Sequence, residues 1–337
     1  MNFLRRNIFS KIILTAIAVI TGLNLASCDS FNEQLEPCPQ GARLRFVYDY
    51  NMEFSNAFPS QVDCLTLLVY DKDGNYVTTF TETSSVLSDE NWRLVLPLAP
   101  GEYIFEAWGG MECGDASFRF NADPSSMNLQ GLQTAIAGDC LTAPVGTRLH
   151  SLFYGRLTME IPAESTDYTE GTVEMMKDTN NIRLLLQNLS GEPVDGDDFV
   201  FSVTDDNTVL DSDNMPVAGN SHTYSPWASG QVSAGVLDNG DEALLAFAEF
   251  STSRLMQSHD ARLVISRRSD MKTIVDIPLI NYLLMLKSQE FATMGSQEFL
   301  DRESRWNMVF FLDNTGSWIR TYIKINDWVV RINNAEL

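Results

Sequence analysis

The segment RLRFVYDY, residues 43–50, has the clearest periodicity in the first part of the chain. Its apolar and aromatic side chains alternate with a mostly polar set: Leu44, Phe46, Tyr48 and Tyr50 face one way, and Arg43, Arg45, Val47 and Asp49 the other. A period of two combined with aromatic residues is typical of a β-strand that buries one face. The segment therefore predicts a β-rich body that begins near residue 43.

The same pattern continues toward the C-terminus. Residues 62–70 place Leu65, Leu67 and Val69 on one face, and Asp73-Gly74 leads into a β-rich run at residues 76–80, which together predict a hairpin. A short helix is expected at residues 279–287, and residues 243–250 fit either a strand or a helix. Further strands are expected at residues 92–98, 102–108, 152–161, 172–177, 181–189, 199–204, 262–267, 272–277, 306–312, 318–325 and 328–332.

The spacing of these strands indicates the class of fold. Many short strands separated by turns, with no alternation of strands and helices, favour β-sandwiches or barrels over a dinucleotide-binding fold. Residues 162–171 are polar and have no apolar period, so we place a domain boundary there. The prediction is an N-terminal β-sandwich domain at residues 41–165 and a C-terminal one at residues 166–337, with loops dominating residues 109–150 and 205–242.

The N-terminal segment has the three parts of a secretory signal peptide. Arg5, Arg6 and Lys11 are followed by an uncharged, mostly apolar run and then by Leu25-Ala26-Ser27-Cys28. A cysteine directly after the small residues fits lipoprotein processing, in which Cys28 is acylated after removal of residues 1–27. The alternatives are an ordinary signal peptide or a transmembrane helix, but the apolar run is short for a helix that must span ~20 residues. Residues 28–40 then form an acidic tether.

The charge of the chain excludes one class of partner. The formal net charge is −22, which argues against binding nucleic acid or gripping anionic lipid through charge. The membrane link is therefore expected to be the lipid on Cys28, which buries its acyl chain in the bilayer.

Four cysteines remain once Cys28 carries lipid, and all lie in the first half: Cys38, Cys64, Cys113 and Cys140. An even number in an exported chain permits two disulfides, for which three pairings are open. Free buried thiols are the alternative.

No arrangement of residues in the sequence indicates catalysis, a metal or a cofactor. His150, His222 and His259 are scattered, and Ser221 beside His222 does not make a catalytic triad. The segment from Asp71 to Asn75 resembles the start of a calcium loop, but Tyr76 stands where that loop needs glycine, so a hairpin turn is favoured. Solvated loops are the favoured interpretation of three acidic clusters, at residues 195–198, 205–206 and 211–213. We expect a protein that is not an enzyme.

The six tryptophans raise the alternative of a glycan-binding surface. Five of them lie in strand patterns, where packing explains them best: Trp92, Trp108, Trp306, Trp318 and Trp328. Trp227 follows Pro226 in a polar stretch and is the one tryptophan expected to face a ligand. A glycan-binding lipoprotein would show exposed aromatic rings in a row on one sheet face.

A set of strand and turn motifs covers nearly all of the chain after Cys28, each of modest specificity. The motifs are residues 38–52 (CPQGARLRFVYDYNM), Ala57-Phe58, Val62-Asp63, residues 67–74 (LLVYDKDG), residues 98–103 (LAPGEY), residues 107–110 (AWGG) and residues 323–333 (IKINDWVVRIN). Together they resemble the FimB-type minor-fimbrium anchor subunits of Bacteroidales.

This resemblance implies an all-β protein with two tandem transthyretin-like Greek-key β-sandwich domains and short helices in loops, after a cleaved signal peptide. It implies an outer-membrane lipoprotein, attached through Cys28 and exposed at the base of a fimbrium, that anchors the fimbrium and helps set its length. Fimbrial shaft subunits would be its partners through strand complementation.

A shaft or tip subunit is the alternative within the same group of proteins. Shaft subunits are opened by proteolysis after an arginine. Arg43 and Arg45 lie inside a predicted strand, whereas Arg148 remains open as a cleavage site.

Overall fold

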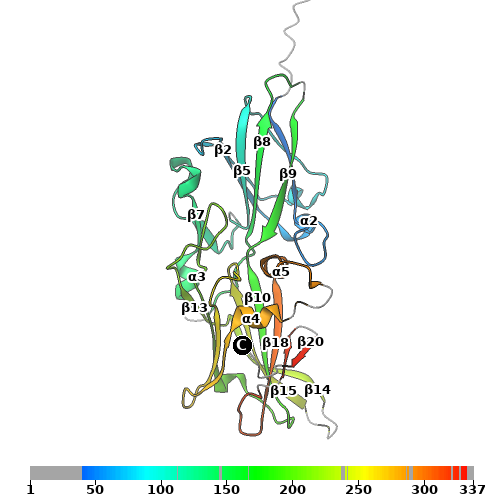
Figure 1. The fold of residues 1–337 in the computed structure, drawn as a ribbon, viewed down its shortest axis with the longest axis vertical. Helices are drawn as coiled ribbons and strands as arrows, with labels where there is room; N and C mark the ends of the chain where they lie inside the picture. The colour runs from blue at the N-terminus through cyan, green and yellow to red at the C-terminus, as the bar shows by residue number, and fades with distance from the viewer. Residues whose placement is uncertain are drawn as a thin grey trace, which may run out of the picture. The chain divides into compact units, whose positions relative to one another are not determined.

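Seven strands of the N-terminal half pair into one sheet in the order β3-β2-β5-β8-β9-β1-β4 (Figure 1). The structure is a computed structural model that describes residues 40–331 except 112, 144–145, 166, 237–239, 241, 286, 288–290, 320–321 and 326–327. The strands of this sheet are β1 (Ala42–Val47), β2 (Leu65–Asp71), β3 (Tyr76–Glu82), β4 (Leu94–Leu96), β5 (Gly101–Gly109), β8 (Phe153–Ile161) and β9 (Thr169–Lys177).

Strand β9 makes this sheet curl around a core. Its last residues, Met175–Lys177, pair antiparallel with the start of β8, whereas Thr169–Glu174 pair in parallel with β1. A Cβ atom on Gly171 would lie 2.7 Å from Leu157 Cδ2 and 3.0 Å from Leu44 Cδ2, so β9 packs tightly between β8 and β1. The enclosed core includes the predicted inward residues of β1 and β2, namely Leu44, Phe46, Tyr48, Leu65, Leu67 and Val69.

Two further sheets form the C-terminal half. The six-stranded sheet has the order β14-β15-β10-β18-β19-β20 and the four-stranded sheet the order β13-β11-β16-β17. Their strands are β10 (Asn180–Asn188), β11 (Phe199–Asp205), β13 (His222–Tyr224), β14 (Ala228–Val236), β15 (Glu242–Thr252), β16 (Arg262–Arg267), β17 (Thr273–Pro278), β18 (Arg305–Leu312), β19 (Tyr322–Ile325) and β20 (Trp328–Arg331).

The predicted patterns in this half are largely confirmed. Ile182, Leu184 and Leu186 are buried on one face of β10, because alternate side chains of a strand point to opposite faces. The hairpin of β16 and β17 is present, and β18 lies between β10 and β19. Residues 243–250 form part of a strand, and α4 (Leu279–Leu284) begins at the start of the expected helix.

The segments predicted as loops contain strands as well. Residues 109–150 hold β6 (Phe118–Phe120), β7 (Gln133–Ile136) and α3 (Gly138–Thr142), while residues 205–242 hold β12 (Val209–Asp211), β13 and β14. The expectation of long exposed loops there was wrong in part. Strands β6, β7, β12 and β13 have only three or four residues and are too short to show a period, and the nine residues of β14 (ASGQVSAGV) are mostly small or polar. The other short helices are α2 (Phe58–Gln61) and α5 (Ser296–Arg302), with single 3₁₀ turns at Ser85–Ser88, Pro124–Ser126, Leu129–Gly131 and Gly196–Asp198.

The halves of the chain are joined by a shared core and a shared sheet. Strand β7 pairs with β12 of the other half, and Tyr70 and Trp108 belong to the same buried cluster as Ile182. Residues from Gln40 onward group into one compact unit. The chain passes from the seven-stranded to the six-stranded sheet at Asp178-Thr179, between β9 and β10, and not at residue 165 (Figure 1). The class is all-β with short helices, as predicted.

Candidate functional site

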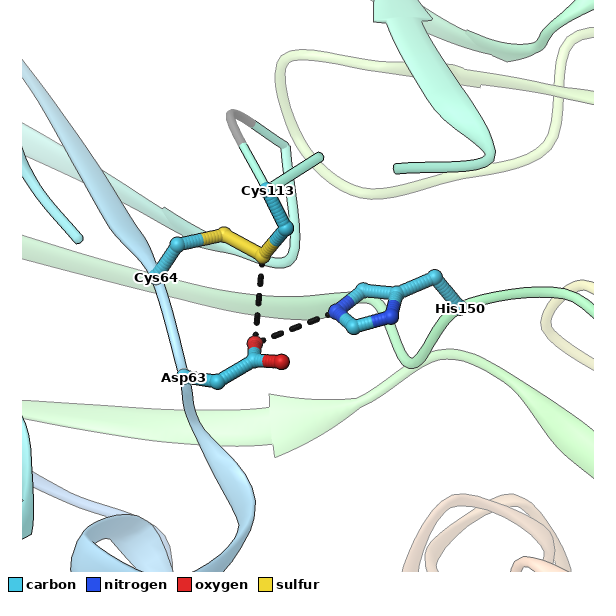
Figure 2. A group of neighbouring side chains, drawn as sticks. All are labelled: Asp63, Cys64, Cys113 and His150. Carbon is cyan, nitrogen blue, oxygen red and sulfur yellow. Dashed lines mark hydrogen bonds and ion pairs between the residues drawn. A yellow bond between two sulfur atoms is a disulfide. The ribbon is translucent and has the colours of Figure 1, made fainter. Parts of the chain in front are cut away.

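One group of ligand-type side chains surrounds a disulfide. Cys64 precedes β2 and is bonded to Cys113, in the loop after β5, with their Cα atoms 5.7 Å apart (Figure 2). His150 lies between two carboxylates: its Nε2 is 3.1 Å from Asp63 Oδ1 and its Nδ1 is 3.2 Å from Asp115. Asp63, Cys64, Cys113 and His150 each place a potential metal-ligand atom within 4.8 Å of the others, but the disulfide leaves no thiolate to bind a metal. The group fastens three chain segments together.

The other cysteines are placed as follows. Cys140 is half-buried and unbonded among the described residues, and burial raises the pKa of its thiol. Cys28 and Cys38 lie outside the described residues, so lipid attachment at Cys28 and any bridge to Cys38 remain predictions. Of the four candidate cysteines, the structure therefore pairs two.

A cavity of about 500 Å³, which we call the seam pocket, lies where the seven-stranded and six-stranded sheets meet. Its floor is the outer face of the six-stranded sheet, and its walls come from the end of β9, the segment before β8 and the segment before β14. The lining residues are Arg148, Leu149, Ser151, Lys177, Asn181, Ile182, Arg183, Trp227, Glu249, Phe250, Arg305, Trp306 and Asn307.

Strand register explains why polar side chains gather on this floor. Asn181 pairs with Arg305 across β10 and β18, while Arg183 pairs with Asn307 on one side and Glu249 on the other. The intervening residue Ile182 is buried in the core on the opposite face. Alternation along three adjacent strands therefore presents their polar positions to the cavity.

The lining is cationic in a strongly acidic protein. Arg148, Lys177, Arg183 and Arg305 face a single acid, Glu249, whose carboxylate lies 3.6 Å from Arg183 Nε. Burial lowers the pKa of Lys177 to about 8, and the nearby charges of Arg305 and Arg148 act in the same direction. The Arg148 guanidinium lies over the Trp227 ring, 5.3 Å from its centroid.

The five tryptophan side chains that the structure describes do not form a row. Trp108 and Trp306 are buried, and Trp92 and Trp318 pack beside Phe46 and Phe310. The Trp328 side chain lies outside the described residues. Trp227 lines the seam pocket, where the sequence had marked it as ligand-facing.

The remaining candidates have local structural roles. The His222 ring packs against Tyr224, and His259 Nδ1 lies 3.0 Å from Asp205. The Asp71 carboxylate accepts hydrogen bonds from the backbone of Asp73 and Asn75, which confirms the hairpin-turn interpretation. Carboxylates of the acidic clusters accept backbone hydrogen bonds as well, as Asp195 does from Asp197.

Arg43 and Arg45, which were considered as cleavage sites, lie in a paired strand. Strand β1 is hydrogen-bonded to β4 on one edge and β9 on the other. Arg43 also forms an ion pair with Glu170 at 2.8 Å. Arg148 is exposed, in the segment before β8.

Known proteins resemble the chain over most of its length. A family model described as fimbrillin-A associated anchor proteins Mfa1 and Mfa2 matches residues 35–334. No curated protein sequence matches. Among solved structures, a candidate adhesin from Bacteroides thetaiotaomicron is 53% identical with a TM-score of 0.84, covering 89% of this chain and 100% of its own.

Two other structures extend the comparison. A candidate polysaccharide-binding protein from the same bacterium is 30% identical with a TM-score of 0.75, over 87% of this chain and 98% of its own. The fimbrial anchor protein Mfa2 from Porphyromonas gingivalis is 16% identical with a TM-score of 0.65 and shares the fold. The match covers 87% of this chain and 99% of that protein's chain.

These matches confirm the resemblance drawn from the motifs. They agree with the absence of a recognisable catalytic arrangement in the sequence, because the proteins concerned are fimbrial and adhesin-type proteins. None of the described helices has the length and apolar character needed to cross a membrane. The chain belongs to the family of fimbrillin-A associated anchor proteins, a family of structural proteins and not of enzymes.

Proposed function

We propose that the chain is an outer-membrane lipoprotein that holds a fimbrium to the cell surface and limits its length. The observation that carries the proposal is the sequence Leu25-Ala26-Ser27-Cys28 directly ahead of a body of the fimbrial anchor family. Acylation of Cys28 would fix the base of the filament in the membrane, since buried acyl chains supply the membrane affinity. The remainder of the chain would hold the first shaft subunit.

Strand complementation is the proposed mode of attachment to the shaft. It adds a strand of one protein to an exposed sheet edge of another, so main-chain hydrogen bonds provide affinity. Strands β3 and β14 stand at the ends of their sheets, and β14 alternates half-buried and exposed residues over its first six positions. These edges are the candidates for receiving a strand.

The state of β1 supports an anchor over a proteolytically opened shaft subunit. All six of its residues pair with β9, Ala42–Leu44 pair with β4 on the other edge, and Arg43 is engaged by Glu170. Removing this strand would take Leu44 and Phe46 out of the core and expose the apolar residues of the same cluster, such as Leu67 and Val173. The groove of this chain is thus filled by its own strand.

A Cys28→Ser variant tests the proposal. Radiolabelled palmitate should label the wild-type protein and not the variant, and surface protease should digest the wild-type protein on intact cells. Electron microscopy of cells carrying the variant should show fimbriae that are shed or longer than normal. Normal fimbrial attachment and length in a strain that lacks the protein would overturn the anchoring role.

A further inference from the structure

We propose that the seam pocket binds an acidic saccharide unit, whose carboxylate or sulfate group is held by Arg148, Lys177 and Arg305. This inference is independent of the anchoring role, because it rests on the pocket and not on Cys28. It assigns the chain a second activity as a receptor for acidic glycan.

The charge balance of the pocket favours an anion. Within the described part of the chain, no carboxylate lies within ion-pair distance of Arg148, Lys177 or Arg305. The single lining acid, Glu249, is beside Arg183. Three cations therefore lie close together without a carboxylate in ion-pair contact, although the chain as a whole carries 45 acidic residues against 23 basic ones. The charge of Arg305 also acts on Glu303, but that carboxylate accepts hydrogen bonds from the backbone of Ser304 and Arg305 and does not line the pocket. Cations kept together without a partner repel one another, and a bound anion relieves that repulsion.

The buried position of Lys177 shows that the cluster is costly to the fold. Its side chain is 8% exposed and its ammonium lies 5.8 Å from the centroid of the Phe153 ring, a contact that only partly replaces water. A protein stabilised by packing alone would gain from an apolar residue at this position. Costly charges in a cavity are typical of binding sites.

The remaining lining favours a sugar ring over a bare anion. Trp227 offers an aromatic side chain that can pack against the apolar face of a pyranose, and its position beside Arg148 places ring and charge together. Asn181 and Ser151 contribute amide and hydroxyl groups suited to sugar hydroxyls. A volume of about 500 Å³ falls within the range of small-molecule sites and suits one or two sugar units.

Calorimetry with the purified protein at low ionic strength tests the inference. The probes are a glucuronate-containing tetrasaccharide, a sulfated galactose disaccharide without uronate, neutral chitotetraose, free sulfate and a glutamate oligopeptide. We expect one of the two acidic saccharides to bind at least about tenfold more tightly than chitotetraose, since hydrogen bonds to charged groups are the stronger ones. The uronate and sulfate arms distinguish the two sources of charge.

Variants of the lining locate the binding. Arg148→Ala/Arg305→Ala should weaken acidic saccharide binding about 10–100-fold. Trp227→Ala should weaken saccharide binding and leave free sulfate unchanged. Arg262→Ala is the matched control, because Arg262 is a comparably exposed arginine on β16 and is not part of the pocket lining. If the double variant does not fold, Arg148→Ala alone replaces it in the binding measurement, because this change affects a single exposed side chain.

Three results with the wild-type protein would overturn the inference: equal affinity for chitotetraose and both acidic saccharides, free sulfate that binds as tightly as the saccharides, or a glutamate peptide that binds more tightly than either acidic saccharide. A double variant that binds the acidic saccharide as tightly as the wild-type protein would overturn it as well. Tighter binding of the glutamate peptide would point to an acidic protein partner. Cys28→Ser should leave saccharide affinity unchanged, so failure of the anchoring proposal and failure of this one are distinguishable.

Discussion

Arg254 and Asp301 form a two-pronged ion pair that is almost completely buried. Arg254 Nε donates to Asp301 Oδ1 at 3.0 Å and Nη2 donates to Oδ2 at 2.9 Å. Arg254 also donates to the Asn214 carbonyl, and Asn214 donates to Asp178 at the turn between β9 and β10. The network therefore ties the C-terminal half to the point where the chain leaves the N-terminal sheet.

Removing one partner of this pair should be strongly destabilising. Asp301→Ala leaves the Arg254 charge buried and unpaired, so we expect the free energy of unfolding to fall by about 3–5 kcal/mol. Urea denaturation followed by tryptophan fluorescence measures it. Asp276→Ala breaks the exposed pair with Arg262 and is expected to cost less than about 1 kcal/mol. Equal losses in the two variants would contradict the role of the buried network.

Asp178 should make stability depend on pH. Burial raises the pKa of this carboxyl from 3.8 to about 7, although Arg254 and Asn214 act against the rise. The folded state then holds a proton that the unfolded state has lost, so this contribution is present below about pH 4 and declines as the pH rises toward about 7. Asp178→Asn should flatten the stability profile between these values. Superimposable profiles of variant and wild type would refute the assignment.

Lys177→Met should stabilise the protein and weaken acidic saccharide binding. The pKa of Lys177 is about 8 in the folded protein against its usual 10.5, so the cost of burying its charge is fully present below pH 8 and disappears as the pH rises to about 10.5. We expect a gain of up to about 3 kcal/mol at pH 7 that vanishes near pH 10.5. Urea denaturation at the two pH values, with calorimetry at pH 7, measures both effects. A stabilised variant with undiminished binding would remove Lys177 from the site.

The disulfide should stabilise the N-terminal half. Cys64 and Cys113 close a loop with a sequence separation of 49, and bridges of this kind contribute about 2–5 kcal/mol. Cys64→Ser/Cys113→Ser should lower the thermal midpoint under oxidising conditions, and calorimetric scans measure it. Cys140→Ser is the control, because this thiol is unbonded among the described residues. A control that shifts as much as the double variant would argue against a special role for the bridge.

Local pattern was sufficient to predict most of the strands. Alternation in β1, β10 and the β16–β17 hairpin reflects burial of one face, which is encoded within each segment. Sheet membership is not encoded locally. Strand β9 follows the polar stretch at which the sequence predicts a domain boundary, so its position in the chain suggests the C-terminal half. Its parallel pairing with β1, more than a hundred residues earlier, places it in the N-terminal sheet.

The seam pocket could be predicted only in part. Trp227 stood out as a tryptophan in a polar segment, and Arg183 alternates with the apolar residues of the strand predicted at 181–189, whereas Arg305 lies just outside the strand predicted at 306–312. Their meeting with Arg148 and Lys177 depends on two sheets coming together, and nothing in the spacing of these residues along the chain indicates it.

The parallel pairing of β1 with β9 has a mechanical consequence for a protein held at its N-terminal end. The chain enters β1 at Ala42 and leaves β9 at Asp178 toward the C-terminal half (Figure 1). Tension applied between these two points pulls neighbouring strands past each other lengthwise. All six registered pairs, from Ala42–Thr169 to Val47–Glu174, then resist together and do not open one after another. In the lipid-anchored state that we propose, β1 would be the first described strand after the membrane link and would be loaded in shear, the geometry that lets a sheet bear load.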